Sequence, residues 1–172
     1  MLFVLSSAWW PPVVQTVVGG LIGALGAIAG GAFSSWFARQ QERQSVAAAF
    51  AGEIQGLLNV VALRQAAEGV LQGKRFPIDD HPFLVFEANV SKIGFLPAPL
   101  ASKVAEFYSV ARGIAVDFRT LYKGEVPAGF SEEAFRLNLS RDLGTLEPKA
   151  IALVAELQKE AVRDWKQVLQ PN

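Results

Sequence analysis

The sequence predicts an all-α protein in which one N-terminal transmembrane helix is followed by an antiparallel helical bundle. Three observations lead to this fold class. The first 38 residues carry no charged side chain, apolar residues after Arg39 recur at spacings of three and four, and no stretch alternates with the two-residue period of a strand. The expected domains are therefore residues 1–38, with a membrane span at about 13–37, and a helical cytoplasmic domain at 39–172.

The run from Val13 to Phe37 is long enough to cross a bilayer, since a span needs about 20 apolar residues. Tryptophans stand on both sides of it, at a separation of roughly 39 Å for a helix rising about 1.5 Å per residue, which approximates the distance between the two membrane interfaces. We expect five side chains to act as interfacial anchors: Trp9, Trp10, Trp36, Arg39 and Arg43.

All 16 basic and 16 acidic residues lie after Ala38, so no Lys or Arg precedes the span. The positive-inside rule then places the N-terminus outside and the C-terminal domain in the cytoplasm. A cleaved signal peptide is the main alternative, because Ala27-Ile28-Ala29 resembles a cleavage site. The uncharged start Met1–Leu5 favours an uncleaved anchor, because signal peptides usually begin with a basic segment.

Small residues gather on one face of the expected span, and bulky ones occupy the other. At about 100° per residue, the small residues form two adjacent stripes, and the expected self-association face is Gly19, Gly20, Gly23, Gly26, Ala27, Gly30 and Gly31. Small residues let helix backbones approach closely in lipid, which favours a homo-oligomer. Two alternatives stay open: glycine is common in membrane helices, and the face could line a lumen.

Four helical segments are expected after the span. They cover residues 39–71, 82–93, 97–123 and 131–169, the last with a break near Gly144–Pro148. Ser131 is expected to cap the final segment, with Glu132 and Glu133 favourably placed in its first turn. The apolar stripes that should form the core are Phe50, Ile54, Leu57, Leu58 and Val61 in the first segment, and Leu100, Val104, Phe107, Tyr108, Ala111, Ala115, Phe118 and Leu121 in the third.

Composition argues against several functional classes. The net charge is zero and no basic stripe is present, so we expect no nucleic-acid partner. Cysteine is absent, and His81 is the single histidine, beside Asp79 and Asp80 in a proline-bounded turn. Adjacent residues in such a turn seldom converge on one ion, so we expect neither a metal nor a cofactor. No nucleophile motif is present, and we expect no enzymatic activity.

A polar face is the remaining candidate for ligand or partner binding. Its residues are Asn89, Lys92, Tyr108 and Arg112, with Arg119 further along the same helix. Such a face could bind an anionic ligand or a partner's carboxylate. A solvated surface or an intrabundle salt bridge is the more common role of such residues.

The segment from Phe86 to Tyr108 resembles a pattern in small uncharacterised bacterial single-pass membrane proteins. The matching strings are Phe86–Asn89, Lys92–Pro97, Lys103-Val104 and Phe107-Tyr108. The resemblance implies a bacterial origin and the same layout of an N-terminal membrane helix and a helical cytoplasmic domain. It implies no activity, so no catalytic residue follows from it.

The expected function is that of a non-enzymatic protein of the bacterial inner membrane. It would self-associate through the glycine-rich helix and present its bundle to a cytoplasmic protein partner. A membrane-perturbing effector or a small channel formed by bundled transmembrane helices is the alternative. An enzyme is the least supported class.

Overall fold

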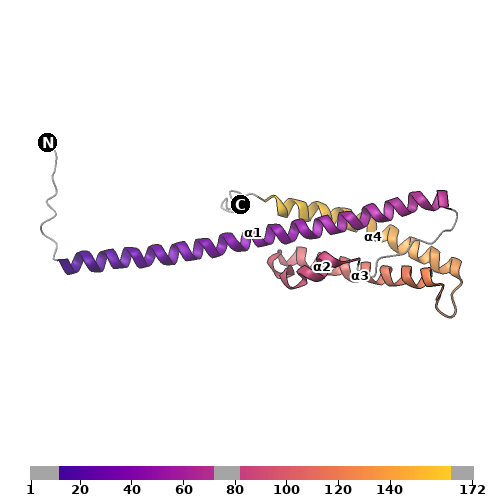
Figure 1. The fold of residues 1–172 in the computed structure, drawn as a ribbon, viewed down its shortest axis with the longest axis horizontal. Coiled ribbons are helices and arrows are strands. Elements are labelled where there is room, and N and C mark those ends of the chain that lie inside the picture. The colour runs from indigo at the N-terminus through magenta and orange to yellow at the C-terminus, as the bar shows by residue number, and fades with distance from the viewer. Residues whose placement is uncertain (1–11, 72–81, 164–172) are drawn as a thin grey trace. The chain divides into compact units, whose positions relative to one another are not determined.

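The computed structural model describes the backbone of residues 12–71 and 82–163, and the side chains of 16–62 and 82–163. These described residues form four α-helices and one 3₁₀-helix, in the order α1 (Pro12–Leu71), α2 (Leu84–Asn89), η2 (Val90–Phe95), α3 (Ala98–Lys123) and α4 (Glu132–Ala161) (Figure 1). The described residues contain no strand, so the all-α class is confirmed. Trp9, Trp10 and His81 lie outside the described residues.

The chain divides into two compact units, residues 1–41 and 42–172. Helix α1 belongs to both, because it continues from the first unit into the second without interruption. Its apolar segment forms the described part of the first unit. Its remaining turns pack with the other helices in the second, which is the helical bundle.

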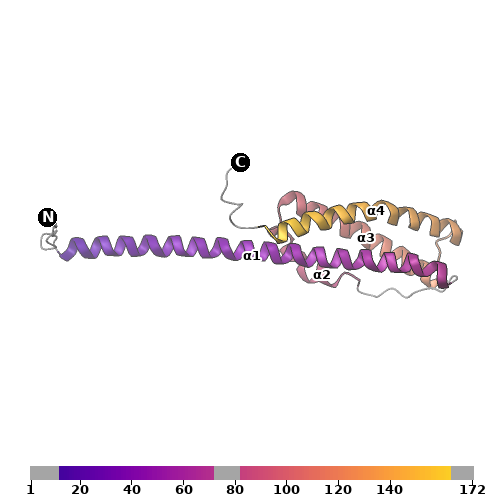
Figure 2. The same ribbon diagram turned by 90° about the horizontal axis from the view of Figure 1, so that it is seen from above.

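The core of the bundle lies where the inner faces of its helices meet. In α1 the predicted stripe is buried at Phe50 and Ile54, whereas Leu57 and Leu58 are partly buried against its edge. Helices α3 and α4 lie side by side and run antiparallel (Figures 1 and 2). The buried core residues are Val46, Ala47, Phe50, Ala51 and Ile54 of α1; Phe83, Phe86 and Leu96 around α2 and η2; Leu100, Val104, Phe107, Tyr108 and Ala111 of α3; and Ala150, Leu153, Val154 and Leu157 of α4.

The expected helix at 82–93 is instead two short helices of different type. Helix α2 stops at Asn89, and the chain continues as the 3₁₀-helix η2 to Phe95. The Asn89 side chain donates a hydrogen bond to the Val85 carbonyl at 2.9 Å. Because asparagine side chains compete with the backbone for such acceptors, the change of helix type falls at this residue.

The ends of α3 are close to those predicted. Pro97 and Pro99 open the helix, where no backbone donor is needed. Gly124 ends it in the left-handed conformation with φ 74°, and its N–H bonds to the Leu121 carbonyl. A residue with a side chain rarely adopts this φ, so glycine suits the position.

Helix α4 starts as predicted but has no break. The Ser131 hydroxyl accepts a hydrogen bond from the Ala134 N–H at 3.1 Å. The expected interruption near Gly144–Pro148 is wrong, because α4 is continuous through Pro148 to Ala161. Proline cannot donate to the Gly144 carbonyl, but Gly144 is exposed, so water can satisfy that group.

Candidate functional site

The apolar segment of α1 is exposed among the residues that the structure describes. Helix α1 is the one described helix that is long and apolar enough to cross a membrane, and none of its most apolar 18-residue window is buried. Every residue from Thr16 to Ser35 is exposed. Its large side chains stand out, with 66% exposure at Ile22 and 70% at Ile28. The buried core helix of a water-soluble protein would show the opposite pattern.

The glycine face is open along its whole described length. A Cβ atom built at Gly19, Gly20, Gly23, Gly26, Gly30 or Gly31 would meet no atom within 4 Å. None of the helices that the structure describes therefore needs these glycines for close packing. Ala27 lies on the same exposed stretch, so the face is accessible in full.

Aromatic residues cluster at the end of the apolar segment. The Phe33 ring lies 6.1 Å from that of Trp36 and 6.5 Å from that of Phe37. Arg39 follows two residues later and is exposed. This order of aromatic and then basic side chains is typical of a membrane–water interface.

Arg43, the last expected interfacial anchor, is engaged within the bundle. Its Nε lies 2.5 Å from Oε1 of Glu160 at the end of α4. Next to it, the Gln44 side chain donates to the Arg163 carbonyl at 2.6 Å. Glu160 is buried, and its carboxylate also lies 3.7 Å from Arg163. The sequence did not predict this cluster, because no local pattern in α1 or α4 shows that these two helices meet here.

Lys92 lies at the same end of the bundle. Its Nζ is 2.6 Å from Oε1 of Glu42, and both side chains are about two-fifths exposed. The ion pair brings η2 beside the first turn of α1 within the bundle. This contact is an intrabundle salt bridge, which the sequence analysis gave as the alternative to ligand binding for Lys92.

Glu53 joins three segments of the bundle. Its Oε1 accepts from the Val85 N–H at 2.7 Å, and its Oε2 accepts from the Phe86 N–H at 3.0 Å. The hydroxyl of Tyr108 donates to the same Oε2 at 2.5 Å. Phe83, the N-cap residue of α2, makes no side-chain cap bond, so the carboxylate from α1 does this instead.

Tyr108 is fully buried among aromatic rings. Its ring stacks on Phe86 with centroids 4.0 Å apart and meets Phe83 edge-on at 5.7 Å. Burial raises the pKa of the Tyr108 phenol well above its usual value of 10.0, and the hydrogen bond to Glu53 and its negative charge raise it further. The phenol is therefore a permanent donor to Glu53 near neutral pH.

The other polar residues of the predicted ligand face also have partners inside the chain. Arg112 lies 3.3 Å from a carboxylate oxygen of Glu87, and its guanidinium stands 5.1 Å from the centre of the Phe86 ring. Asn89 bonds to the α2 backbone, as described above. The structure thus places Asn89, Lys92, Tyr108 and Arg112 in separate intramolecular contacts, and a shared ligand role for them stays a prediction.

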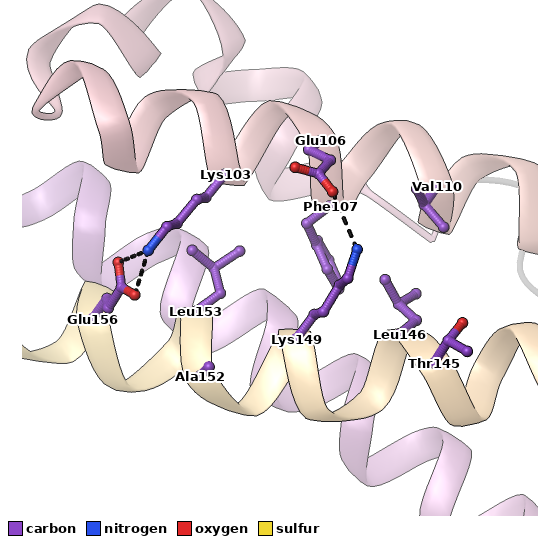
Figure 3. Close-up of a pocket in the computed structure, with 10 residues that line it drawn as sticks. All are labelled: Lys103, Glu106, Phe107, Val110, Thr145, Leu146, Lys149, Ala152, Leu153 and Glu156. Atoms are coloured by element: carbon purple, nitrogen blue, oxygen red, sulfur yellow. Dashed lines mark hydrogen bonds and ion pairs between the residues drawn. The ribbon is translucent and has the colours of Figure 1, made fainter.

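A shallow groove of about 390 Å³ lies between α3 and α4 (Figure 3). Phe107 and Leu153 point into it, and two ion pairs cross it from helix to helix. Lys103 bonds to Glu156 at 2.5 Å, and Lys149 lies 3.3 Å from Glu106. The four charged side chains are about half exposed or more, so they contribute little to stability.

No other constellation with obvious chemistry is present in the described part of the chain. Among the described residues, no group of three or more His, Asp or Glu side chains could hold a metal ion. Comparison of the chain with protein families, curated proteins and solved structures finds no match. The resemblance to small bacterial membrane proteins therefore stays an expectation from residues 86–108.

Proposed function

We propose that residues 13–37 of α1 cross the bacterial inner membrane once and anchor the helical bundle in the cytoplasm. In this proposal the anchors associate through their glycine face, and the bundle is presented to a cytoplasmic protein partner. No enzymatic activity is part of the proposal. The observation that carries it is the apolar and charge-free segment of α1, whose residues from Thr16 to Ser35 are all exposed.

Lipid around this segment is energetically favourable because its large apolar side chains are exposed. Val17, Leu21, Ile22, Leu25, Ile28 and Phe33 are each more than half exposed. Removing one such side chain from water contributes about 1.5–3 kcal/mol. A bilayer supplies that environment for all of them at once, and the helix satisfies its own backbone groups within it.

A first experiment tests the anchor itself. Membranes from cells that express the full chain are washed with alkaline carbonate and then extracted with detergent. We expect the intact chain, with Met1–Leu5 still attached by mass spectrometry, only in the detergent extract. Recovery in the carbonate wash would contradict the anchor, and loss of residues 1–29 would establish the signal-peptide alternative.

Orientation follows from the basic residues that come after the span. Arg39 and Arg43 follow it, and no Lys or Arg precedes it. We expect a C-terminal fluorescent-protein fusion to be bright and a C-terminal alkaline phosphatase fusion to be inactive. An active phosphatase would reverse the orientation.

Self-association is tested on the glycine face. Because the chain has no cysteine, Ala27→Cys provides a single site for disulfide crosslinking within the membrane. We expect crosslinked dimers that disappear when Gly23 and Gly26 are both replaced by Leu, because bulky side chains keep the backbones apart. The matched control replaces Leu21 and Leu25 with Val on the opposite side and should leave the dimers intact. Dimers that persist in the Gly23→Leu/Gly26→Leu variant would remove the glycine interface.

Growth and membrane potential of expressing cells distinguish this proposal from a membrane-perturbing effector or channel. Induced expression should leave growth and the membrane potential, followed with a potential-sensitive dye, unchanged. Rapid depolarisation that the two glycine substitutions abolish would instead favour a conducting assembly.

A further inference from the structure

The end of the bundle at which α1 enters it carries exposed apolar and basic side chains. We propose that this end lies in the headgroup region of the bilayer that α1 crosses. Its contact residues would be Val90, Phe95 and Val162, with Lys92 and Arg163 facing the phosphates. The inference rests on the proposed membrane span and adds a second lipid-binding surface to it.

Distance along the chain brings this surface close to the membrane. Glu42, the first residue of the bundle, is five residues beyond Phe37, a helical rise of roughly 7.5 Å. Each headgroup layer is about 5–8 Å thick. The residues that contact the first bundle turn of α1 are therefore within reach of the headgroups.

Two ion pairs connect other segments to the first bundle turn of α1. The ion pair of Lys92 with Glu42 fixes η2 there, and the ion pair of Arg43 with Glu160 fixes the end of α4. Both views show α4 ending at the end of the bundle where the chain turns from α2 into α3, which is the turn that contains η2 (Figures 1 and 2). Segments that are far apart in sequence thus form one surface.

Three apolar side chains at this end of the bundle are exposed. Phe95 is 41% exposed although the next residue, Leu96, is buried, and Val90 is 48% exposed. At the end of α4, Val162 is 80% exposed. A headgroup layer accommodates single apolar side chains of this kind at little depth.

Charge at this end complements a phospholipid surface. Among the described bundle residues that form these ion pairs, the basic ones are Arg43, Lys92 and Arg163, and the acidic ones are Glu42 and Glu160. The surplus is basic, although the whole chain is neutral. Lys92 and Arg163 keep about two-fifths of their side chains exposed while paired, so both can reach anionic headgroups.

Site-directed spin labelling of the full chain tests the inference. Single cysteines are introduced as Phe95→Cys or Val162→Cys, with Leu137→Cys as the matched control. Leu137 is 72% exposed and lies in α4, over 20 residues before Glu160. A fourth variant, Leu25→Cys, reports on the span. Each protein is reconstituted in vesicles of phosphatidylethanolamine and phosphatidylglycerol, and label accessibility to oxygen and to a water-soluble nickel chelate is measured.

We expect the ratio of oxygen to nickel accessibility to be severalfold higher at positions 95 and 162 than at 137. Replacing phosphatidylglycerol with phosphatidylcholine should lower it at position 95. Equal, water-like values at 95, 162 and 137 would overturn the inference, and so would a label at 95 shielded from both reagents, which indicates a protein partner. If Leu25→Cys reports lipid while Phe95→Cys reports water, only this inference fails. If Leu25→Cys also reports water, the proposed membrane span fails.

Discussion

The Tyr108 hydroxyl donates a hydrogen bond to Oε2 of Glu53, which connects the centre of α3 with α1 inside the bundle. The same carboxylate caps α2, so one acidic side chain supports three segments. Tyr108 is fully buried among aromatic rings, and Glu53 is partly buried. The pair therefore contributes to the fold of the bundle.

Replacing Glu53 with Ala should lower the free energy of unfolding by about 2–4 kcal/mol, because three donors lose their acceptor. Hydrogen exchange at the Val85 and Phe86 amides should accelerate more than exchange in α3. Glu87→Ala is the matched control, since Glu87 pairs with Arg112 at the surface and should cost less than about 1 kcal/mol. Unchanged exchange at the two amides would contradict the capping role.

Alkaline pH should destabilise the bundle through Tyr108. Below pH 10.0 the phenol is neutral in both states, so its contribution does not vary. Above that value the unfolded chain ionises while the raised pKa keeps the folded phenol neutral. Stability then falls by up to about 1.4 kcal/mol per pH unit from this group.

Denaturant unfolding of the detergent-solubilised chain at a series of pH values measures this effect. Tyr108→Phe should be less stable near neutral pH but should lose this part of the alkaline slope. Tyr122→Phe, at a residue 41% exposed, should retain the slope. Equal slopes for the wild type and Tyr108→Phe would show that the phenol does not stay neutral in the fold.

Arg43→Met should destabilise the bundle by about 2–4 kcal/mol, because the buried Glu160 carboxylate loses its closest cation. Glu160→Leu in addition should recover part of the loss, since no uncompensated charge then remains. A double-mutant cycle measures the coupling. The comparison pair, Lys149 and Glu106, is about two-thirds exposed and should show coupling below about 1 kcal/mol. Similar coupling for the two pairs would contradict the importance of burial.

Two glycines should respond in opposite directions to alanine. Gly113 lies inside α3, and a Cβ atom there meets nothing within 4 Å, so Gly113→Ala should stabilise the bundle by about 0.5–1 kcal/mol. Gly124 has a φ of 74°, so Gly124→Ala should destabilise it by about 1 kcal/mol. Thermal unfolding followed by circular dichroism checks both variants. A destabilising Gly113→Ala would indicate that another molecule packs at that position.

The helices that the sequence predicted best are those with strong local signals. Helical spacing of Phe50 and Ile54 identified a buried face, and Ser131 marked the start of α4, because caps and periodicity act within a few residues. The predicted break at Pro148 was wrong for the same reason. A proline signal is local, whereas the packing of α4 against α3 on both sides of Pro148 is tertiary.

The polar contacts could not be predicted from the sequence. Arg43 was expected at the lipid interface, and its position just after the span gave no indication of Glu160, more than 100 residues away. The role of Glu53 was not predicted either, because a single carboxylate within a helix is usually a solvated surface residue. Only the folded arrangement brings it to the N-terminus of α2.

The bond from Gln44 to the carbonyl of Arg163 joins residues 119 positions apart. A ribosome adds about 5–20 residues each second. Gln44 must therefore wait on the order of ten seconds for its partner after α4 to be synthesised. During that interval Arg43 also lacks Glu160, so these contacts between α1 and the end of α4 can form only after nearly the whole sequence has been translated.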